Sequence, residues 1–148
     1  MEQLTCMLDI VQHIVESHPA EDLTTLRERE GGWTVTEVVG HLLDCERLFL
    51  ERAQLTVTQD SPMLPFPPQD EEVLKGRYNE REPMDIVNDW REAREKFLAF
   101  LKTIPEEDWE REGRHPQYPP FSLNDQLFLA SWHDPLHIRQ ITRILSKS

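Results

Sequence analysis

The 148-residue sequence has few cysteines and few basic residues. Its two cysteines are Cys6 and Cys45. Both lie in helical patterns, so we expect two reduced thiols that fill the core as small apolar side chains. The chain has 16 Lys and Arg against 28 Asp and Glu, a net charge of −12. A surface of that charge repels phosphate backbones, so nucleic acid is not an expected partner.

Long apolar runs and alternating patterns are also missing. No segment approaches the roughly 20 apolar residues of a membrane span, and the opening MEQLTCMLDI lacks the basic and apolar regions of a signal peptide. We therefore expect no membrane partner and a cytoplasmic location. No alternation of apolar and polar residues predicts a strand. The length favours a single domain over residues 1–148.

What the sequence does contain is helical periodicity. Apolar stripes predict four helices, over about residues 4–15, 35–58, 83–104 and 123–144. Thr34 with Glu37 forms a capping box ahead of the second helix, and Pro83 suits the first turn of the third. Ser122 is the expected N-cap of the fourth.

A long connection, residues 59–82, separates the second and third helices. Its four prolines argue against helix there, yet Met63, Leu64 and Phe66 are apolar enough to pack on the helices. Its 24 residues can cross a whole bundle at about 3.3 Å per residue. The expected fold class is therefore all-α, a four-helix bundle in up-down-down-up order with long connections.

Three histidines occupy inward positions of two predicted helices. His133 and His137 are four residues apart, so both imidazoles stand on one face of the last helix. His41 lies on the inward face of the second helix, and antiparallel packing places it at a similar depth. Three neutral imidazoles from two helices are typical of a metal site with an open coordination position. Ordinary core histidines are the alternative.

Polar neighbours of these histidines are candidates for supporting roles. Asp44 and Asp134 are candidates for orienting an imidazole N–H or accepting a proton, or else are solvated acids of a helix face. Cys45, one turn after His41, is a candidate fourth ligand or nucleophile, although the pattern favours a plain core cysteine.

Pro135 interrupts the last helix between the two histidines. It removes a backbone donor and opens the turn against the carbonyl of Ser131. The kink is either a tolerated irregularity or a feature that sets the spacing of the imidazoles. The remaining histidines, His13, His18 and His115, are expected to be ordinary surface residues.

Two segments together carry a family resemblance: WTVTEVVGHLLDCE at 33–46 and HDPLHIRQI at 133–141. The Trp before the helix, the H-L-x-D-x-E segment and the H-x-x-x-H-x-x-Q-I ending resemble the DinB/YfiT-like family of metalloenzymes. The resemblance implies a four-helix bundle, often a homodimer. It also implies a divalent metal held by three histidines, which map onto His41, His133 and His137.

The resemblance further implies thiol chemistry. Characterised members are similar to S-transferases that use bacillithiol, mycothiol or another small thiol, whose pKa the metal lowers. We therefore expect a metal-dependent thiol S-transferase acting on a small-molecule thiol and an electrophilic substrate. Zn or Ni is the favoured metal, with Fe or Mn as alternatives. The competing functions are a hydrolase that uses metal-bound water, and a non-catalytic, stress-related binding protein whose metal is structural.

Overall fold

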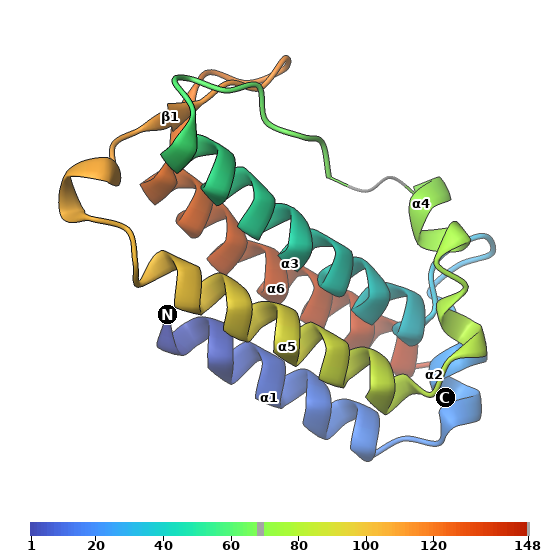
Figure 1. Cartoon of the computed structure of the whole chain (residues 1–148). Helices are drawn as coiled ribbons and strands as arrows, with labels where there is room; N and C mark the ends of the chain where they lie inside the picture. Colours follow the sequence, from blue (N-terminus) through green and yellow to red (C-terminus); the bar gives the residue numbers. More distant parts are fainter. Residues whose placement is uncertain (68–69, 148) are drawn as a thin grey trace.

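The computed structural model describes residues 1–67 and 70–147 and is mostly helical (Figure 1). Four long helices make up the bundle: α1 (Glu2–Glu16), α3 (Val35–Thr58), α5 (Pro83–Leu101) and α6 (Leu123–Leu145). In Figure 1, α1 and α6 run one way and α3 and α5 the other. The all-α bundle in up-down-down-up order is confirmed.

The four helices pack as a square around a common core. Both α3 and α1 pack against α5 and α6. Trp90 of α5 and Ile141 of α6 meet Leu42 of α3 in one apolar cluster, and Phe49 with Phe97 belongs to a second. Helix α3 is buried around much of its circumference. A polar side chain near its middle is therefore removed from water.

Reciprocal capping boxes fix where α3 and α6 begin. The Thr34 hydroxyl accepts a bond from the Glu37 backbone N–H at 3.2 Å, and a Glu37 carboxylate oxygen accepts from the Thr34 N–H at 2.8 Å. Ser122 and Asp125 repeat the arrangement at α6. These caps satisfy N–H groups that a helix start leaves free, and so set the register of both helices.

Within residues 1–67 and 70–147, six short elements lie in the connections: α2 (Ala20–Thr25), α4 (Asp70–Lys75), η1 (Tyr78–Glu80), η2 (Glu106–Asp108), β1 (Glu112–Gly113) and β2 (Phe121–Ser122). The expectation of no helix in 59–82 is wrong for its second half, because its prolines all precede residue 69. Residues 68–69 of this connection lie outside the described part of the chain. The expectation of no sheet is also wrong, since β1 and β2 form an antiparallel pair.

The proline-rich half of this connection packs through the buried side chains of Pro62 and Leu64. Leu64 is buried, and its N–H donates to the carbonyl of Arg114 at 2.9 Å. Met63 and Phe66, expected to pack as well, are about half exposed. The loop is thus held over the end of the bundle by Pro62 and Leu64, by the backbone beside the hairpin, and by Arg52 of α3, which donates to the Pro65 carbonyl at 2.9 and 2.6 Å.

The two cysteines differ in environment. Cys45 is buried as predicted, whereas Cys6 is exposed, which corrects the expectation of two core thiols. Helix α1 buries Leu4 and Leu8 in the core. Cys6 is two positions after Leu4, so it lies about 200° around the helix from Leu4, on the exposed side.

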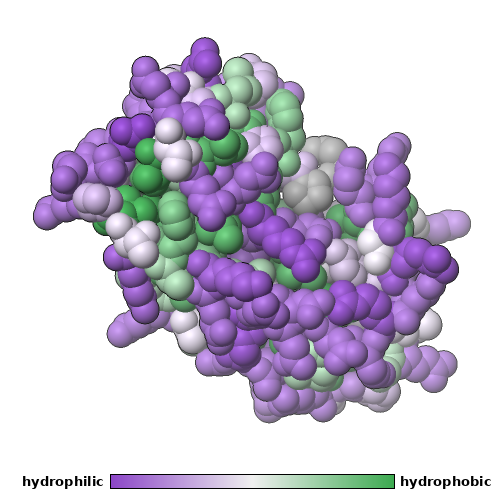
Figure 2. Space-filling view, viewed as in Figure 1, coloured by the Kyte–Doolittle hydropathy of each residue, from purple (hydrophilic) through white to green (hydrophobic). Residues whose placement is uncertain are grey.

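The molecular surface agrees with the acidic composition. The face in Figure 2 is mostly hydrophilic, with apolar surface gathered toward the end of the bundle where β1 lies. Among the described residues, none of the helices has the length and apolar character needed to cross a membrane.

Candidate metal centre

The three predicted histidines meet between α3 and α6. His133 Nε2 lies 3.3 Å from His41 Nε2 and 3.1 Å from His137 Nε2. The antiparallel packing of the two helices brings His41 alongside the i, i+4 pair. The Nε2 atoms of His41 and His137, from two helices, therefore both lie close to that of His133.

Hydrogen bonds among the rings do not satisfy this cluster. His137 Nδ1 donates to Gln140 Oε1 at 2.9 Å, which leaves a lone pair on His137 Nε2. His133 Nε2 has two imidazole neighbours, but a single ring nitrogen either donates or accepts. When all three rings are neutral, one of the two close nitrogen pairs therefore lacks a hydrogen bond, because it brings together either two donors or two acceptors.

A divalent cation fits this donor set. Nitrogens about 2.0–2.1 Å from a tetrahedral ion lie about 3.3–3.4 Å from one another. The separations of the two pairs that include His133 Nε2, 3.1 and 3.3 Å, are close to that spacing.

Burial keeps the three imidazoles neutral. Loss of hydration, with a smaller effect from the nearby His137, lowers the pKa of His41 to about 3. The same causes lower the pKa of His133 to about 3, and burial also lowers the pKa of His137. Neutral imidazoles offer the lone pairs that a metal requires.

Cys45 lies beside the cluster without facing it. Its Sγ is 3.5 Å from His41 Nε2 and 3.8 Å from His41 Nδ1. A sulfur sharing a cation with Nε2 would lie beyond that nitrogen and much farther from Nδ1. The nearly equal distances place the thiol abreast of the ring, although a ligand set of His41, Cys45 and His133 lies within 4.8 Å.

The thiol of Cys45 is also protonated in this environment. Burial, followed by the charge of Asp44, raises its pKa to about 12. A buried, neutral thiol is a poor nucleophile. Both the position and the protonation state of Cys45 favour the prediction of a core cysteine.

The two candidate acids pair with other side chains. Asp44 accepts a bond from the Tyr78 hydroxyl at 2.7 Å and lies 3.8 Å from Arg47. Asp134 accepts from Arg94 at 2.9 Å. Burial raises the pKa of Asp134 to about 6 despite the guanidinium. Direct orientation of an imidazole by either acid stays a prediction.

A buried ionic network beside the histidines was not predicted from the sequence. Arg94 of α5 donates to Glu46 of α3 through Nε at 2.7 Å and Nη2 at 2.6 Å, to Asp134 of α6 at 2.9 Å, and to the Leu4 carbonyl of α1 at 2.6 Å. One side chain thus joins all four long helices. Its two carboxylates leave one uncompensated negative charge. The sequence feature that could have predicted this network is the presence of charged residues at inward helix positions.

An aromatic side chain and a pocket border the cluster on one side. The Trp33 ring lies 4.8 Å from that of His41 and 6.4 Å from that of His137, measured between centroids. A pocket of about 550 Å³ reaches the cluster at His137; its other lining residues are Glu28, Arg29, Gly31, Gly32, Trp33, Asp70 and Gln140. That volume suits a small organic substrate.

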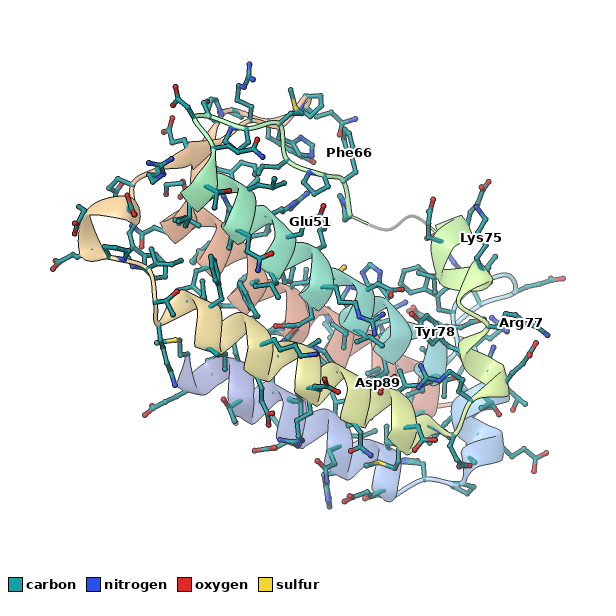
Figure 3. All side chains as sticks on the ribbon, viewed as in Figure 1. Glu51, Phe66, Lys75, Arg77, Tyr78 and Asp89 are labelled. Atoms are coloured by element: carbon teal, nitrogen blue, oxygen red, sulfur yellow. The ribbon has the colours of Figure 1, made fainter. Side chains whose placement is uncertain are left out.

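The segment after α4 packs directly on the backbone next to His41. Figure 3 labels Tyr78, which comes from η1 and reaches α3. A Cβ at Gly40 would lie 2.1 Å from the Tyr78 ring. Only glycine allows this approach.

Pro135 lies within a continuous α6. Because Pro135 has no N–H, the Ser131 carbonyl lacks its helical donor, and it accepts a bond from Gln3 Nε2 of α1 at 3.4 Å instead. The remaining histidines lie outside the cluster. His13 is exposed, and His115 packs against aromatic rings of the loops.

Comparison with known proteins finds one family and several relatives. The model of the DinB superfamily matches residues 3–141. A "Putative metal-dependent hydrolase" of Oceanobacillus iheyensis is 29% identical over 120 residues, 80% of this chain and 69% of the relative. "Putative metal-dependent hydrolase YfiT" of Bacillus subtilis is 29% identical over 119 residues, 78% and 66%. The aligned region thus covers about two thirds of each relative.

Solved structures share the fold. YfiT from Bacillus subtilis, described as "a probable metal-dependent hydrolase with an unusual four-helix bundle topology", superposes with a TM-score of 0.86 at 26% identity. It covers 99% of this chain and 83% of that one. A mycothiol-dependent maleylpyruvate isomerase superposes at 0.74 with 15% identity, over 95% of this chain and 59% of that chain. The second likeness is one of fold.

Proposed function

This chain belongs to the DinB superfamily, and from that premise we propose that it is a metal-dependent thiol S-transferase whose divalent ion is held by His41, His133 and His137. The observation that carries the proposal is that His133 Nε2 lies 3.3 Å from His41 Nε2 and 3.1 Å from His137 Nε2. Zn or Ni is the proposed metal, because imidazole nitrogen suits both.

The bound ion would supply a Lewis acid that lowers the pKa of a substrate thiol. The protein's own residues arrange the site around it. Gln140 holds His137 with its Nε2 lone pair toward the other rings, and Trp33 covers His41. The pocket at His137 admits the substrate from one side. Lowering a thiol pKa from about 8.5 to 7 raises the thiolate fraction at neutral pH roughly tenfold.

The sulfur is proposed to come from the substrate. Cys45 is buried, has a raised pKa and lies abreast of the His41 ring. A bundle of the same topology occurs in a mycothiol-dependent isomerase, so this fold is compatible with thiol-dependent chemistry.

Metal-dependent hydrolysis is the second candidate function. The names of the Oceanobacillus and Bacillus relatives favour it. The same ligands would serve a reaction in which water replaces the thiol. The two candidates differ in one requirement, because only the S-transferase needs a thiol.

The deciding experiment compares the two requirements on one preparation. The metal content of the full chain is measured by elemental analysis. Conjugation of bacillithiol, mycothiol or cysteine to monobromobimane is then followed with and without dialysis against a chelator. We expect chelator-sensitive conjugation, which returns when the native metal is restored.

Two other results would contradict the S-transferase. Chelator-sensitive cleavage of p-nitrophenyl esters without thiol, and no conjugation, would support the hydrolase. Full metal content with neither reaction would favour a non-catalytic, stress-related protein with a structural metal. His13→Ala, a variant outside the cluster, serves as the control for the purification.

A further inference from the structure

One buried cation on α3 has no opposite charge beside it. Arg52 is 4% exposed, and its Nε and Nη2 both donate to the carbonyl of Pro65, at 2.9 and 2.6 Å. The other buried guanidinium, that of Arg94, is bonded to the carboxylates of Glu46 and Asp134. Among the described residues, no carboxylate bonds to Arg52. A buried charge is costly without a counter-charge, so Arg52 lacks a partner that its burial requires.

The pKa values of the two buried arginines reflect this difference. Burial lowers the pKa of Arg52. Arg94 is buried as well, but its bonds to Glu46 and Asp134 outweigh the loss of hydration and raise its pKa. A neutral amide side chain could donate to the Pro65 carbonyl without the cost of a buried charge. Holding the loop therefore does not by itself explain a guanidinium at this position.

Arg52 shares a face of α3 with the metal centre. At 100° per residue, His41, Cys45 and Arg52 lie within about 40° of one another around the helix. Arg52 follows His41 in the chain, and helical side chains lean toward the N-terminus, which is toward the histidines. Burial raises the pKa of the Cys45 thiol, and the charge of Arg52 acts in the opposite direction. The guanidinium is therefore within electrostatic range of the thiol beside His41.

One edge of the Arg52 guanidinium is free. A guanidinium has five N–H donors, and a pair of them along one edge can hold a carboxylate through two parallel bonds. Pro65 occupies the edge formed by Nε and Nη2. Within residues 1–67 and 70–147, the fully buried side-chain atoms without a partner are Gln126 Oε1 and His133 Nδ1. Arg52 Nη1 has no partner there either, so it keeps a contact with solvent, and the edge formed by Nη1 and Nη2 is available to a ligand.

The proposed metal would add to the positive charge beside Arg52. A divalent ion on the histidines brings two positive charges and Arg52 brings one, whereas the network around Arg94 has one excess negative charge. A ligand with two negative charges would balance the remainder. A substrate thiolate supplies one of these charges, and a carboxylate would supply the other.

We propose that Arg52 binds a carboxylate of the substrates that react at the metal centre, and so makes the enzyme selective for anionic reactants. This inference rests on the proposed S-transferase function, because it names a substrate feature for the same site. The carboxylate belongs either to the thiol or to the electrophile. A bidentate pair removed from water is expected to favour the charged reactant at least tenfold over its neutral amide in kcat/KM.

Reactants that differ by one charge test the proposal and locate the carboxylate. Metal-loaded wild-type protein is given 3-mercaptopropionate or 3-mercaptopropionamide with iodoacetamide, and 3-mercaptopropionamide with iodoacetate. In each reaction an S–C bond forms, the C–I bond breaks, iodide leaves with the bonding electrons, and the thiol proton passes to the buffer. Each rate is divided by the uncatalysed rate.

The three rates decide both questions. A tenfold preference for the anionic thiol supports the proposal and assigns the carboxylate to the thiol, and a preference for iodoacetate assigns it to the electrophile. Equal efficiencies in all three catalysed reactions would overturn the role of Arg52 and leave the S-transferase intact.

Arg52→Gln removes the charge and keeps a donor for the Pro65 carbonyl. It is expected to lose the preference, chiefly through a higher KM for the anionic reactant. Arg52→Lys keeps the charge without the paired donors and is expected to recover part of the preference. Arg47→Gln, which alters an exposed arginine of the same helix, is expected to match the wild type. Circular dichroism and elemental analysis check that each variant is folded and loaded. A folded, loaded Arg52→Gln that retains the preference would overturn the proposal.

Binding of an unreactive anion tests Arg52 without catalysis. Sodium propionate a few-fold above its dissociation constant is expected to raise the thermal midpoint of the wild type by about 2–4 °C over sodium chloride of equal ionic strength. Propionamide is expected to have no effect. The rise should persist after chelation, which excludes a carboxylate bound to the metal, and should be absent in Arg52→Gln.

This measurement also separates the two proposals. A rise that depends on Arg52, in a protein that conjugates none of the thiols, would retain the carboxylate site and refute the S-transferase. No rise, a rise lost on chelation, or an equal rise in Arg52→Gln would overturn the role of Arg52.

Discussion

The three histidines are proposed to act as one unit, because His133 Nε2 lies within 3.3 Å of both other Nε2 atoms. Replacing His41, His133 or His137 by Ala leaves two imidazoles, and a two-nitrogen site holds a divalent ion far more weakly. We expect metal occupancy after desalting to fall at least tenfold in each variant, measured by elemental analysis.

His13→Ala and His115→Ala are the matched controls, since both histidines lie outside the cluster. Their metal content is expected to equal that of the wild type. Full occupancy in all three cluster variants would refute the proposed ligand set.

The Cys45→Ser variant tests whether this thiol is only a core residue or takes part in the reaction. Because its sulfur lies abreast of the His41 ring and its pKa is raised, we expect Cys45→Ser to keep its metal content and its conjugation rate within a few-fold. Loss of activity at normal metal content would make Cys45 the nucleophile. Loss of the metal itself would make it a ligand. Cys6→Ser, on the exposed side of α1, controls for the loss of a thiol.

Asp134 makes opposite contributions to the metal-free and the metal-loaded protein. With Glu46 it leaves one excess negative charge around Arg94, which burial penalises. A nearby dication benefits from that same charge. At pH 8 we therefore expect Asp134→Asn to raise the thermal midpoint of the metal-free protein by a few degrees and to weaken metal binding several-fold.

Calorimetric unfolding and metal titration measure the two effects of Asp134→Asn separately. The Asn side chain still accepts a hydrogen bond from Arg94, so the network need not collapse. Asp89→Asn, which changes a surface ion pair, is expected to alter neither quantity. A parallel fall in thermal midpoint and metal affinity would reduce Asp134 to a purely structural role.

At the scale of elements, local patterns predicted the long helices but not what lies between them. The capping residues Thr34 and Ser122 and the 3.6-residue spacing are read within a few positions of the chain, so α3 and α6 were predicted nearly to their ends. The β1–β2 pair joins two-residue segments separated by a loop without helical or alternating periodicity, and the Leu64 anchor contacts Arg114, about 50 residues away. Short-range periodicity contains no information about such contacts.

The candidate site also contains residues that local patterns predicted and residues that they did not. The histidines were found because two of them repeat at helical spacing and the third lies at a matching depth on an antiparallel helix. Arg94 and Trp33 were assigned no role, because their partners are on other elements. A polar residue on an inward helix position is a sign that such a partner exists.

The segment containing η1 depends on one close backbone contact. A methyl group at Gly40 would lie 2.1 Å from the Tyr78 ring, whose hydroxyl is bonded to Asp44. We expect Gly40→Ala to destabilise the protein by about 1–3 kcal/mol, because the ring must leave its position. Urea unfolding measures the loss.

A double variant identifies the cause of the Gly40→Ala effect. Adding Tyr78→Ala removes the ring that the new methyl group meets, so the two costs should not add. Strict additivity would mean that the cost of Gly40→Ala does not arise from the Tyr78 ring, because helix propensity by itself favours Ala over Gly. In that case the contact between η1 and α3 would not limit the substitution.

At the scale of the whole molecule, burying neutral histidines ties stability to pH. The unfolded chain protonates His41 and His133 below about pH 6.5, whereas in the folded protein their pKa values are about 3. Between these limits the unfolded state binds more protons, so the free energy of unfolding falls as the pH is lowered. Asp134 acts in the opposite direction between pH 3.8 and about 6, because its folded pKa is raised.

Two imidazoles outweigh one carboxyl group, so the metal-free protein is expected to lose stability on acidification. At 1.36 kcal/mol per proton and pH unit, the net loss between pH 7.5 and 5.5 is about 2 kcal/mol. Urea unfolding in the presence of a chelator measures it. Because the other carboxylates also titrate, the decisive comparison is with His41→Gln/His133→Gln, which should show a shallower dependence, while His13→Ala should match the wild type. Equal slopes in all three proteins would mean that the imidazoles take up protons without unfolding, and that the closed cluster opens readily to water.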